Sequence, residues 1–283
     1  MASSAEPAAP GQPAPTEPAL TKPAPTAPAL TAPALVPFTA HNMVLADGSL
    51  SIPGEILLEE HPLPKAVLRT LDAFFPRRRD GEFSIVDLGC LEGGYTALFA
   101  RAGFDALGID GRPANIERCE FGPGQLGLQG LRFVCDDVHN LAAYGTFDAT
   151  FCCGLLYHLD DPIAFLRLAS KMTRRVLILQ THFATDSVPP RFPNLSELTT
   201  HEGVSGRWYS EHPEDATEEE MLSQAWSSIG NRRSFWVEKR HLLQTLVDVG
   251  FAPVFEQYDS LYNVVEDDYI AEWGRSLFVA VRS

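Results

Sequence analysis

The chain has 283 residues, of which 45% are hydrophobic, and its formal net charge is −15. That length is enough for one α/β domain of ordinary size with additions and a sizeable buried core. The acidic excess argues against a broad nucleic-acid-binding surface, because affinity for phosphate backbones depends largely on basic side chains.

The cysteines bear on the cellular compartment. There are five of them, at Cys90, Cys119, Cys135, Cys152 and Cys153. Most lie on or beside expected core strands, where cysteine behaves as a small buried hydrophobe. Their spacing does not suit zinc, and the sequence shows neither a secretory signal nor an apolar run long enough to span a membrane. We therefore expect reduced thiols in a cytoplasmic protein without membrane contact.

Two segments precede the main α/β pattern. Residues 1–37 form a Pro/Ala/Thr tract in which PAL recurs at positions 18, 28 and 33. This composition cannot bury enough apolar surface to offset the entropy of ordering, so it predicts a disordered arm. Residues 38–82 carry turn signals at Asp47-Gly48 and Pro53-Gly54, followed by an amphipathic helix over LPKAVLRTLDAFFP.

The stretch FSIVDLGCLEGGY, residues 83–95, organises the rest of the chain. Its first six residues are mostly apolar and β-prone, which predicts a buried strand. Gly89, Gly93 and Gly94 follow, and then the helical pattern TALFARAG, which stops at Gly103. Strand, glycine turn and helix form the opening of a nucleotide-binding unit, although a plain strand-to-helix connection has the same pattern.

Further strands end in chemically useful residues. ALGID ends in Asp110, about 20 residues after the glycines, where an acid can accept hydrogen bonds from ribose hydroxyls. LRFVC runs into Asp136 and Asp137, FDATFCC runs into GLLYHLDDP, and RVLILQT forms a fifth strand before His182. Acids after the second and third strands, with this fourth segment, fit S-adenosylmethionine better than a dinucleotide.

Residues 83–183 resemble the core of a class I S-adenosylmethionine-dependent methyltransferase. FCCGLLYHLDDP and ILQTH also resemble the branch that contains the tRNA uridine carboxymethyltransferases and many bacterial methyltransferases. The resemblance implies a Rossmann-like α/β sheet, mostly parallel with an antiparallel last strand, and helices on both faces. It also implies S-adenosylmethionine as the cofactor. In such enzymes a leading segment like 38–82 often covers the ligand pocket; a helix that only caps the sheet is the alternative.

The resemblance also organises the remaining chain. Residues 184–233 interrupt the α/β rhythm and suit a substrate cap inserted after the fifth strand. Residues 234–283 return to the core, with a helix that Gly250 stops and two last strands, APVFEQYDSL and SLFVAVRS. The loop YNVVEDDYIAEWGR between those strands is long enough for a short helix of its own.

The cofactor residues are transferred by resemblance. Asp87 is expected near the amino group of the methionine part, which the backbone of Gly89, Cys90 and Gly93 also lines. Leu91 departs from the usual motif, where glycine is common. Asp110 with Gly111 is expected at the ribose. Asp137 with Val138 is expected at the adenine, or Asp136 if the register differs by one. Gly154 and Leu155 are expected beside the sulfonium.

Three residues are candidates for catalysis, namely Tyr157, His158 and His182, at the carboxyl edge of neighbouring strands. A histidine there suits a general base because its pKa lies near working pH. Each histidine has a structural alternative, holding a loop by hydrogen bonds. A metal site made with His201-Glu202 is a weaker alternative, since no pair has helical ligand spacing. Four aromatic residues have two interpretations: packing in the core or in a lid, or a cage for a cationic amine. They are Trp208, Tyr209, Phe235 and Trp236.

The leading functional hypothesis is methyl transfer to a small-molecule, peptide or carrier-bound acceptor. The second is a tRNA wobble-uridine carboxymethyl- or methyltransferase, which the acidic balance disfavours. A third, from another class, is a non-catalytic cofactor-binding interaction module, against which the intact acids Asp87, Asp110 and Asp137 argue. An NAD-dependent oxidoreductase would leave GLLYHLDDP without a role. The sequence indicates neither the acceptor nor the oligomeric state.

Overall fold

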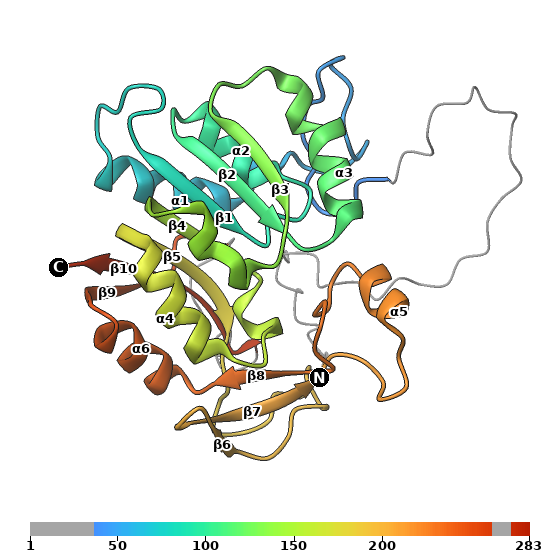
Figure 1. Ribbon diagram of the computed structural model, residues 1–283, viewed down its shortest axis with the longest axis vertical. Helices are drawn as coiled ribbons and strands as arrows, with labels where there is room; N and C mark the ends of the chain where they lie inside the picture. The colour runs from blue at the N-terminus through green and yellow to red at the C-terminus, as the bar shows by residue number, and fades with distance from the viewer. Residues whose placement is uncertain (1–36, 262–272) are drawn as a thin grey trace, which may run out of the picture.

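A seven-stranded sheet forms the centre of the computed structural model, which describes residues 37–261 and 273–283 (Figure 1). Its strand order is β3-β2-β1-β4-β5-β10-β9. The strands are β1 (Ser84–Leu88), β2 (Asp105–Asp110), β3 (Leu131–Cys135), β4 (Phe147–Cys153), β5 (Thr173–His182), β9 (Phe251–Gln257) and β10 (Arg275–Arg282). Only β10 runs antiparallel to its neighbours β5 and β9, as the sequence predicts for the last strand.

Helices cover both faces of this sheet (Figure 1). They are α1 (Pro62–Phe74), α2 (Gly94–Arg101), α3 (Pro113–Phe121), α4 (Pro162–Met172) and α6 (Lys239–Asp248). Alternate strand residues face opposite sides: Ile85 packs with α1 and α2, whereas its neighbour Val86 packs with α4 and α6. This alternation follows from the two-residue period of a strand, and it gives the sheet an apolar layer on each side.

The pairing register brings the predicted site to one edge. Leu88 of β1 lies opposite both Ile109 of β2 and Cys152 of β4, and Cys152 lies opposite Leu179 of β5. The residues that follow these four positions therefore leave the sheet at one level. Ligands of open α/β sheets bind at this carboxyl edge.

The insertion after β5 forms a second, three-stranded sheet. Its strands are β6 (Thr199–His201), β7 (Val204–Ser210) and β8 (Arg233–Val237), and helix α5 (Glu218–Ser223) lies between β7 and β8. The predicted boundary between residues 233 and 234 cuts this sheet, because β8 pairs with β7 from Arg233 to Val237. The apolar run SFWV thus belongs to the cap sheet; its pattern alone could not distinguish the two sheets.

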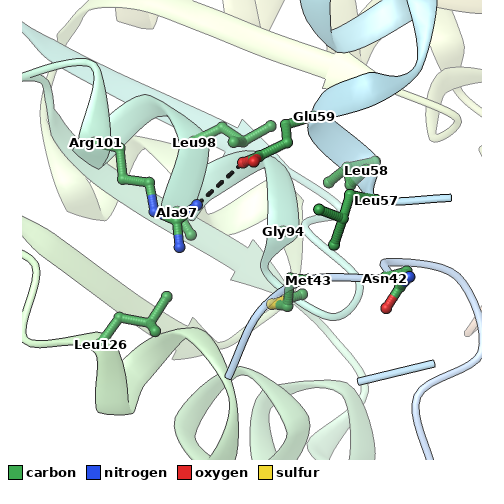
Figure 2. Close-up of a pocket in the computed structure, with 10 residues that line it drawn as sticks. All are labelled: Asn42, Met43, Leu57, Leu58, Glu59, Gly94, Ala97, Leu98, Arg101 and Leu126. Carbon is green, nitrogen blue, oxygen red and sulfur yellow. Dashed lines mark hydrogen bonds and ion pairs between the residues drawn. The ribbon is translucent and has the colours of Figure 1, made fainter. Parts of the chain in front are cut away.

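The leading segment is attached to helix α2 and the glycine turn. The fully buried Glu92 carboxylate accepts hydrogen bonds from Thr39 N (2.6 Å), Ala40 N (3.0 Å) and His41 N (2.9 Å). A short 3-10 helix, η1 (Leu58–Glu60), continues the contact, and Figure 2 shows Glu59 paired with Arg101 beside a small pocket. None of the predicted site residues lines that pocket. Helix α1 packs on the sheet, as a capping helix does.

Short 3-10 segments lie in two of the connections between core elements. The loop after α3 contains a 3-10 turn, η2 (Pro123–Leu126), and the short helix after β3 is η3 (Val138–Tyr144), also 3-10. The predicted N-terminal arm, up to residue 36, and most of the loop between β9 and β10, residues 262–272, lie outside the described residues. Among the described residues no helix is both long and apolar enough to cross a membrane.

Candidate active site

Asp87 closes strand β1 as a buried carboxylate. Its Oδ2 accepts a hydrogen bond of 2.6 Å from Thr96 Oγ1 on helix α2. Burial, opposed by the Thr96 hydrogen bond and assisted by the charge of Asp110, raises the pKa of Asp87 to about 7. A cationic group placed beside Asp87 would restore its charged form.

The glycine turn packs against a ring of β3 and against the turn that follows β4. Gly89 and Gly93 have φ angles of 72° and 76°, and Leu91 between them has 52°, in the left-handed region that favours glycine. A Cβ on Gly93 would lie 2.7 Å from the Phe133 ring of β3, and one on Gly89 would lie 3.3 Å from Leu155 after β4. Leu91 therefore adopts a left-handed backbone conformation at a local conformational cost.

Asp110 connects the glycine turn with helix α3. Its Oδ2 accepts from Leu91 N (2.9 Å), and its Oδ1 accepts from Arg112 N (2.9 Å) and Asn115 Nδ2 (3.0 Å). Burial raises the pKa of Asp110, while these hydrogen bonds oppose the shift. The carboxylate thus combines the expected position at the end of β2 with a local role at the start of α3.

The acids after β3 have different surroundings. Asp136 accepts from Tyr144 OH (2.5 Å) and Asn140 Nδ2 (2.8 Å), and the Tyr144 hydrogen bond lowers the pKa of Asp136. Asp137 is exposed and caps η3 by accepting from His139 N (2.9 Å), and the following Val138 is buried. Both acids lie at the edge assigned to adenine, so the choice between them stays a prediction.

The structure brings the three catalytic candidates together after β4 and β5. The Tyr157 ring lies 4.3 Å from the His158 ring and 4.6 Å from the His182 ring, between ring centroids. Tyr157 and His158 belong to a 3-10 turn, η4 (Leu156–His158), which directly follows Gly154 and Leu155. The proposed sulfonium position and the candidate bases are therefore adjacent.

His182 lies among aromatic rings. It stacks on Trp236 of β8, with ring centroids 4.7 Å apart, and its Nδ1 is 2.8 Å from the carbonyl oxygen of Trp273. Because a carbonyl only accepts, Nδ1 carries the proton and Nε2 holds the lone pair. Burial holds the pKa of His182 well below its usual value, and the charge of Arg275 lowers it further.

His158 has a carboxylate partner that the sequence analysis missed. Its Nδ1 lies 2.8 Å from Glu211 Oε1, and the Glu211 side chain is 1% exposed. The same oxygen accepts from Ser234 Oγ at 2.7 Å. Glu211 lies 53 residues from His158, in the cap, and no local pattern distinguishes it from the other acids there.

A second missed group stands opposite His182. Arg275 pairs with His182 across β10 and β5, and its Nη2 donates to Gln180 Oε1 at 2.7 Å. Cys153 Sγ donates to the same oxygen at 3.0 Å. Arg275 and Gln180 also line a small pocket between β5, β10 and β9. The acceptor side thus contains a cation as well as rings and imidazoles.

The remaining candidates serve the cap. His201 Nε2 lies 2.8 Å from the carbonyl oxygen of Asp160, and Glu202 accepts from the backbone N–H groups of Ile163 and Ala164 at the start of α4. Among residues 37–261 and 273–283, no three His, Cys, Asp or Glu side chains are grouped to hold a metal. Trp208 and Phe235 pack against each other at 5.0 Å.

Comparisons with known proteins agree with this geometry. The family described as "Methyltransferase domain" matches residues 60–254. The N-terminal domain of EvdMO1, crystallised in the presence of S-adenosylhomocysteine and D-fucose, superposes with a TM-score of 0.61 at 25% identity, covering 84% of this chain and 88% of that one. A Burkholderia thailandensis 1,6-didemethyltoxoflavin-N1-methyltransferase, at 19% identity and a TM-score of 0.50 over 80% of each chain, shares the fold.

Two curated relatives match a shorter stretch. The ubiquinone biosynthesis O-methyltransferase of Parvibaculum lavamentivorans is 31% identical over 94 residues, or 33% of this chain. That of Psychrobacter arcticus is 34% identical over 91 residues, or 31% of this chain. The matched part spans only 37% and 35% of those relatives.

The fold and the family match are those of a class I S-adenosylmethionine-dependent methyltransferase. The chain belongs to the methyltransferase-domain family. The predictions of this class, its fold and its cofactor are thereby confirmed. The narrower resemblance to tRNA uridine carboxymethyltransferases stays a prediction, as do the roles of the individual site residues.

Proposed function

We propose that the protein transfers a methyl group from S-adenosylmethionine to a hydroxyl group of a small molecule. The observation that carries this proposal is the grouping of Tyr157, His158 and His182 directly after Gly154 and Leu155. A hydroxyl acceptor needs a base for its proton, and this group supplies two imidazoles. The names of the curated relatives, both O-methyltransferases, support the same acceptor atom.

Charge favours His158 over His182 as the base. Taking a proton makes an imidazole cationic, and the His158 cation would face the buried Glu211 carboxylate. The His182 cation would instead form among rings and opposite Arg275, and burial already holds its pKa well below the usual value. We infer that His158 accepts the proton at Nε2 and that His182 positions the acceptor.

The other residues align the reactants and exclude water. The cofactor supplies an activated methyl group, so the protein must hold the acceptor oxygen in line with it. Phe192, Trp236 and the Tyr157 ring surround His182, which gives a flat acceptor an apolar surface. Arg275 could pair with an anionic substituent of that acceptor or with the oxygen as it loses its proton.

The proposal also includes the size of the methyl acceptor and the cellular compartment of the protein. A small acceptor is supported by the D-fucose and the 1,6-didemethyltoxoflavin named for two structural neighbours, and the net charge of −15 disfavours tRNA. A cytoplasmic location is supported by the five cysteines, which are all free thiols.

The test is a methyl-acceptor screen with radiolabelled S-adenosylmethionine. Separate pools of phenols, sugars, short peptides and unmodified tRNA would be incubated with the wild-type protein and with His158→Ala. We expect label in a hydroxylated small molecule, with much less transfer by His158→Ala. Label found solely in tRNA or in peptides would refute the proposal.

A further inference from the structure

Arg112 links the cofactor edge to the cap. Its side chain is 7% exposed and lies beside the start of α3, where its backbone N–H donates to Asp110. Its guanidinium crosses to the cap and donates to the carbonyl oxygens of Ser227 (2.6 Å), Ser228 (3.2 Å) and Leu222 (3.2 Å). Arg112, which follows the expected ribose-binding residues, thus holds a cap segment that lies more than 100 positions later in the chain.

The same cap segment lies on the adenosine end of the site. The Ile229 Cδ1 atom is 2.6 Å from where a Cβ on Gly111 would be, and the carbonyl oxygen of Asp136 is 3.7 Å from that point. Ile229 therefore lies against Gly111, which directly follows Asp110 at the end of β2, where the ribose is expected.

Few apolar contacts hold this segment in place. Met221 is buried, but Leu222, Trp226 and Ile229 are between 36% and 50% exposed. Figure 1 shows α5 set apart from the small sheet, on the side of α3. Low apolar burial is typical of segments that open locally, and carbonyl partners make the Arg112 contacts easier to exchange for water than an ion pair.

The segment also reaches the candidate base. Ser228 N donates to Glu211 Oε2 at 3.2 Å, and His212 Nε2 lies 2.9 Å from the carbonyl oxygen of Ser228. Glu211 in turn holds His158 through its other carboxylate oxygen. A continuous set of contacts therefore runs from Asp110 through Arg112 and Ser228 to Glu211 and His158, outside the central sheet.

We propose that residues 221–229 form a lid over the adenosine end of S-adenosylmethionine, that Arg112 latches this lid, and that its closure places Glu211 against His158. The last step rests on the proposed function, whereas the lid rests on cofactor binding alone. Ile229 is then a cofactor-contact residue supplied by the cap, and Arg112 is a positioning residue. Cofactor binding prepares the acceptor side before the acceptor arrives.

Arg207 offers a matched control. Its guanidinium is also buried, at 3% exposure, and also bonds carbonyl oxygens, but those belong to Thr185, Asp186 and Ser196 within the cap. Arg207→Gln therefore disturbs the cap without cutting its link to the core. Arg112→Gln cuts the link, and Ile229→Ala removes the adenosine contact without changing any charge.

Calorimetry with S-adenosylhomocysteine would compare these variants with the wild type. We expect roughly a tenfold loss of affinity for Arg112→Gln, in the range of ordinary coupling between sites. For the partly exposed Ile229 side chain we expect about a threefold loss. Arg207→Gln should stay within about twofold. Hydrogen exchange should show residues 221–232 slowed by the ligand in the wild type but not in Arg112→Gln.

The outcomes separate the two proposals. Wild-type affinity in both Arg112→Gln and Ile229→Ala, with unchanged exchange protection, would overturn the lid while leaving the methyltransferase assignment in place. Equal losses in Arg112→Gln and Arg207→Gln would also overturn it, because a general loosening of the cap would explain both. Failure of the wild type to bind S-adenosylhomocysteine would overturn the lid and the proposed function together.

Discussion

The two halves of the site edge are built differently. On the cofactor side, Asp87 and Asp110 bond to partners at most 19 residues away, such as Thr96, Leu91 and Arg112. On the acceptor side, His158 and His182 bond to partners 53 and 91 residues away. One half is thus a property of a continuous stretch of chain, and the other exists only once the cap and the last strand have assembled.

This difference decides how amino-acid substitutions should affect each half of the site. A local hydrogen bond persists as long as its turn and helix form, so the cofactor half depends on few other elements. The acceptor half depends on the cap sheet, η4 and β10 together, and a change in any of them moves its groups. We therefore expect substitutions on the acceptor side to affect turnover and those on the cofactor side to affect binding.

The largest effect should come from the base. His158→Ala should lower kcat by roughly 10²–10⁴ while leaving affinity for S-adenosylhomocysteine within a few fold. Part of the loss should return at high pH, where the acceptor ionises by itself. His182→Ala should raise the acceptor KM more than it lowers kcat. His201→Ala, which alters a cap histidine bonded to Asp160, is the control.

That assignment would be reversed by one result. If His182→Ala shows the large kcat loss with recovery at high pH, and His158→Ala does not, then His182 is the base. The acceptor found in the screen described above is needed for this measurement, which would use initial rates over a range of pH.

The next effect is on cofactor binding. Asp110→Ala removes a charged acceptor for the ribose hydroxyls, which should cost about 1.5–3 kcal/mol, or ten- to a hundredfold in affinity. Asp105→Ala is the control, because Asp105 begins the same strand at its opposite end and pairs with Arg132. Calorimetric affinity equal to wild type in folded Asp110→Ala would remove Asp110 from the ribose site.

A smaller effect should appear as a pH dependence. With a pKa of about 7, Asp87 is mostly protonated at pH 6 in the free protein, whereas a cationic amino group beside it would favour the carboxylate. Binding should therefore release a proton, and affinity should rise about fivefold from pH 6 to pH 7. Asp87→Asn should lose that rise. A rise that persists in Asp87→Asn would assign it to another group, such as Asp110.

The smallest effect is expected from the N-terminal arm. Deleting residues 1–36 should leave the thermal midpoint and the affinity for S-adenosylhomocysteine unchanged, because a Pro/Ala/Thr tract has too few large apolar side chains to add to the core. The deletion keeps Pro37, whose carbonyl oxygen accepts from Arg118. Deleting residues 1–44 should lower the midpoint, since Glu92 would lose its donors at Thr39, Ala40 and His41. Equal behaviour of the two deletions would contradict the importance of that contact.

The same contrast explains what the sequence could predict. Asp87, the glycine turn and Asp110 were identifiable because each follows a strand whose apolar run is visible, and their partners lie nearby in the chain. The topology followed from the resemblance to class I methyltransferases that these strands and motifs carry. Even the departure at Leu91 is accommodated within the turn, by a left-handed backbone.

Long-range partners carried no such signal. Glu211 is one of several acids in a polar insertion, and Arg275 lies beyond a long loop, so nothing in their neighbourhoods points to His158 or His182. The boundary of the cap was misplaced for a related reason, because β8 has the same apolar pattern as a core strand. Pairing partners, which are not encoded locally, decide such cases.

Glu92 has a consequence for the route by which the two substrates reach the site. Thr39, Ala40 and His41 donate four hydrogen bonds to its buried carboxylate, so moving the leading segment would leave that buried charge with Arg118, at 3.7 Å, in place of those four hydrogen bonds. We therefore expect the leading segment to stay in place, and the cap to be the part that moves when the site opens. Methyl donor and acceptor then share one passage, and we expect the donor to bind first and be the last to leave as product. Competitive product inhibition by S-adenosylhomocysteine against the donor alone would show that order.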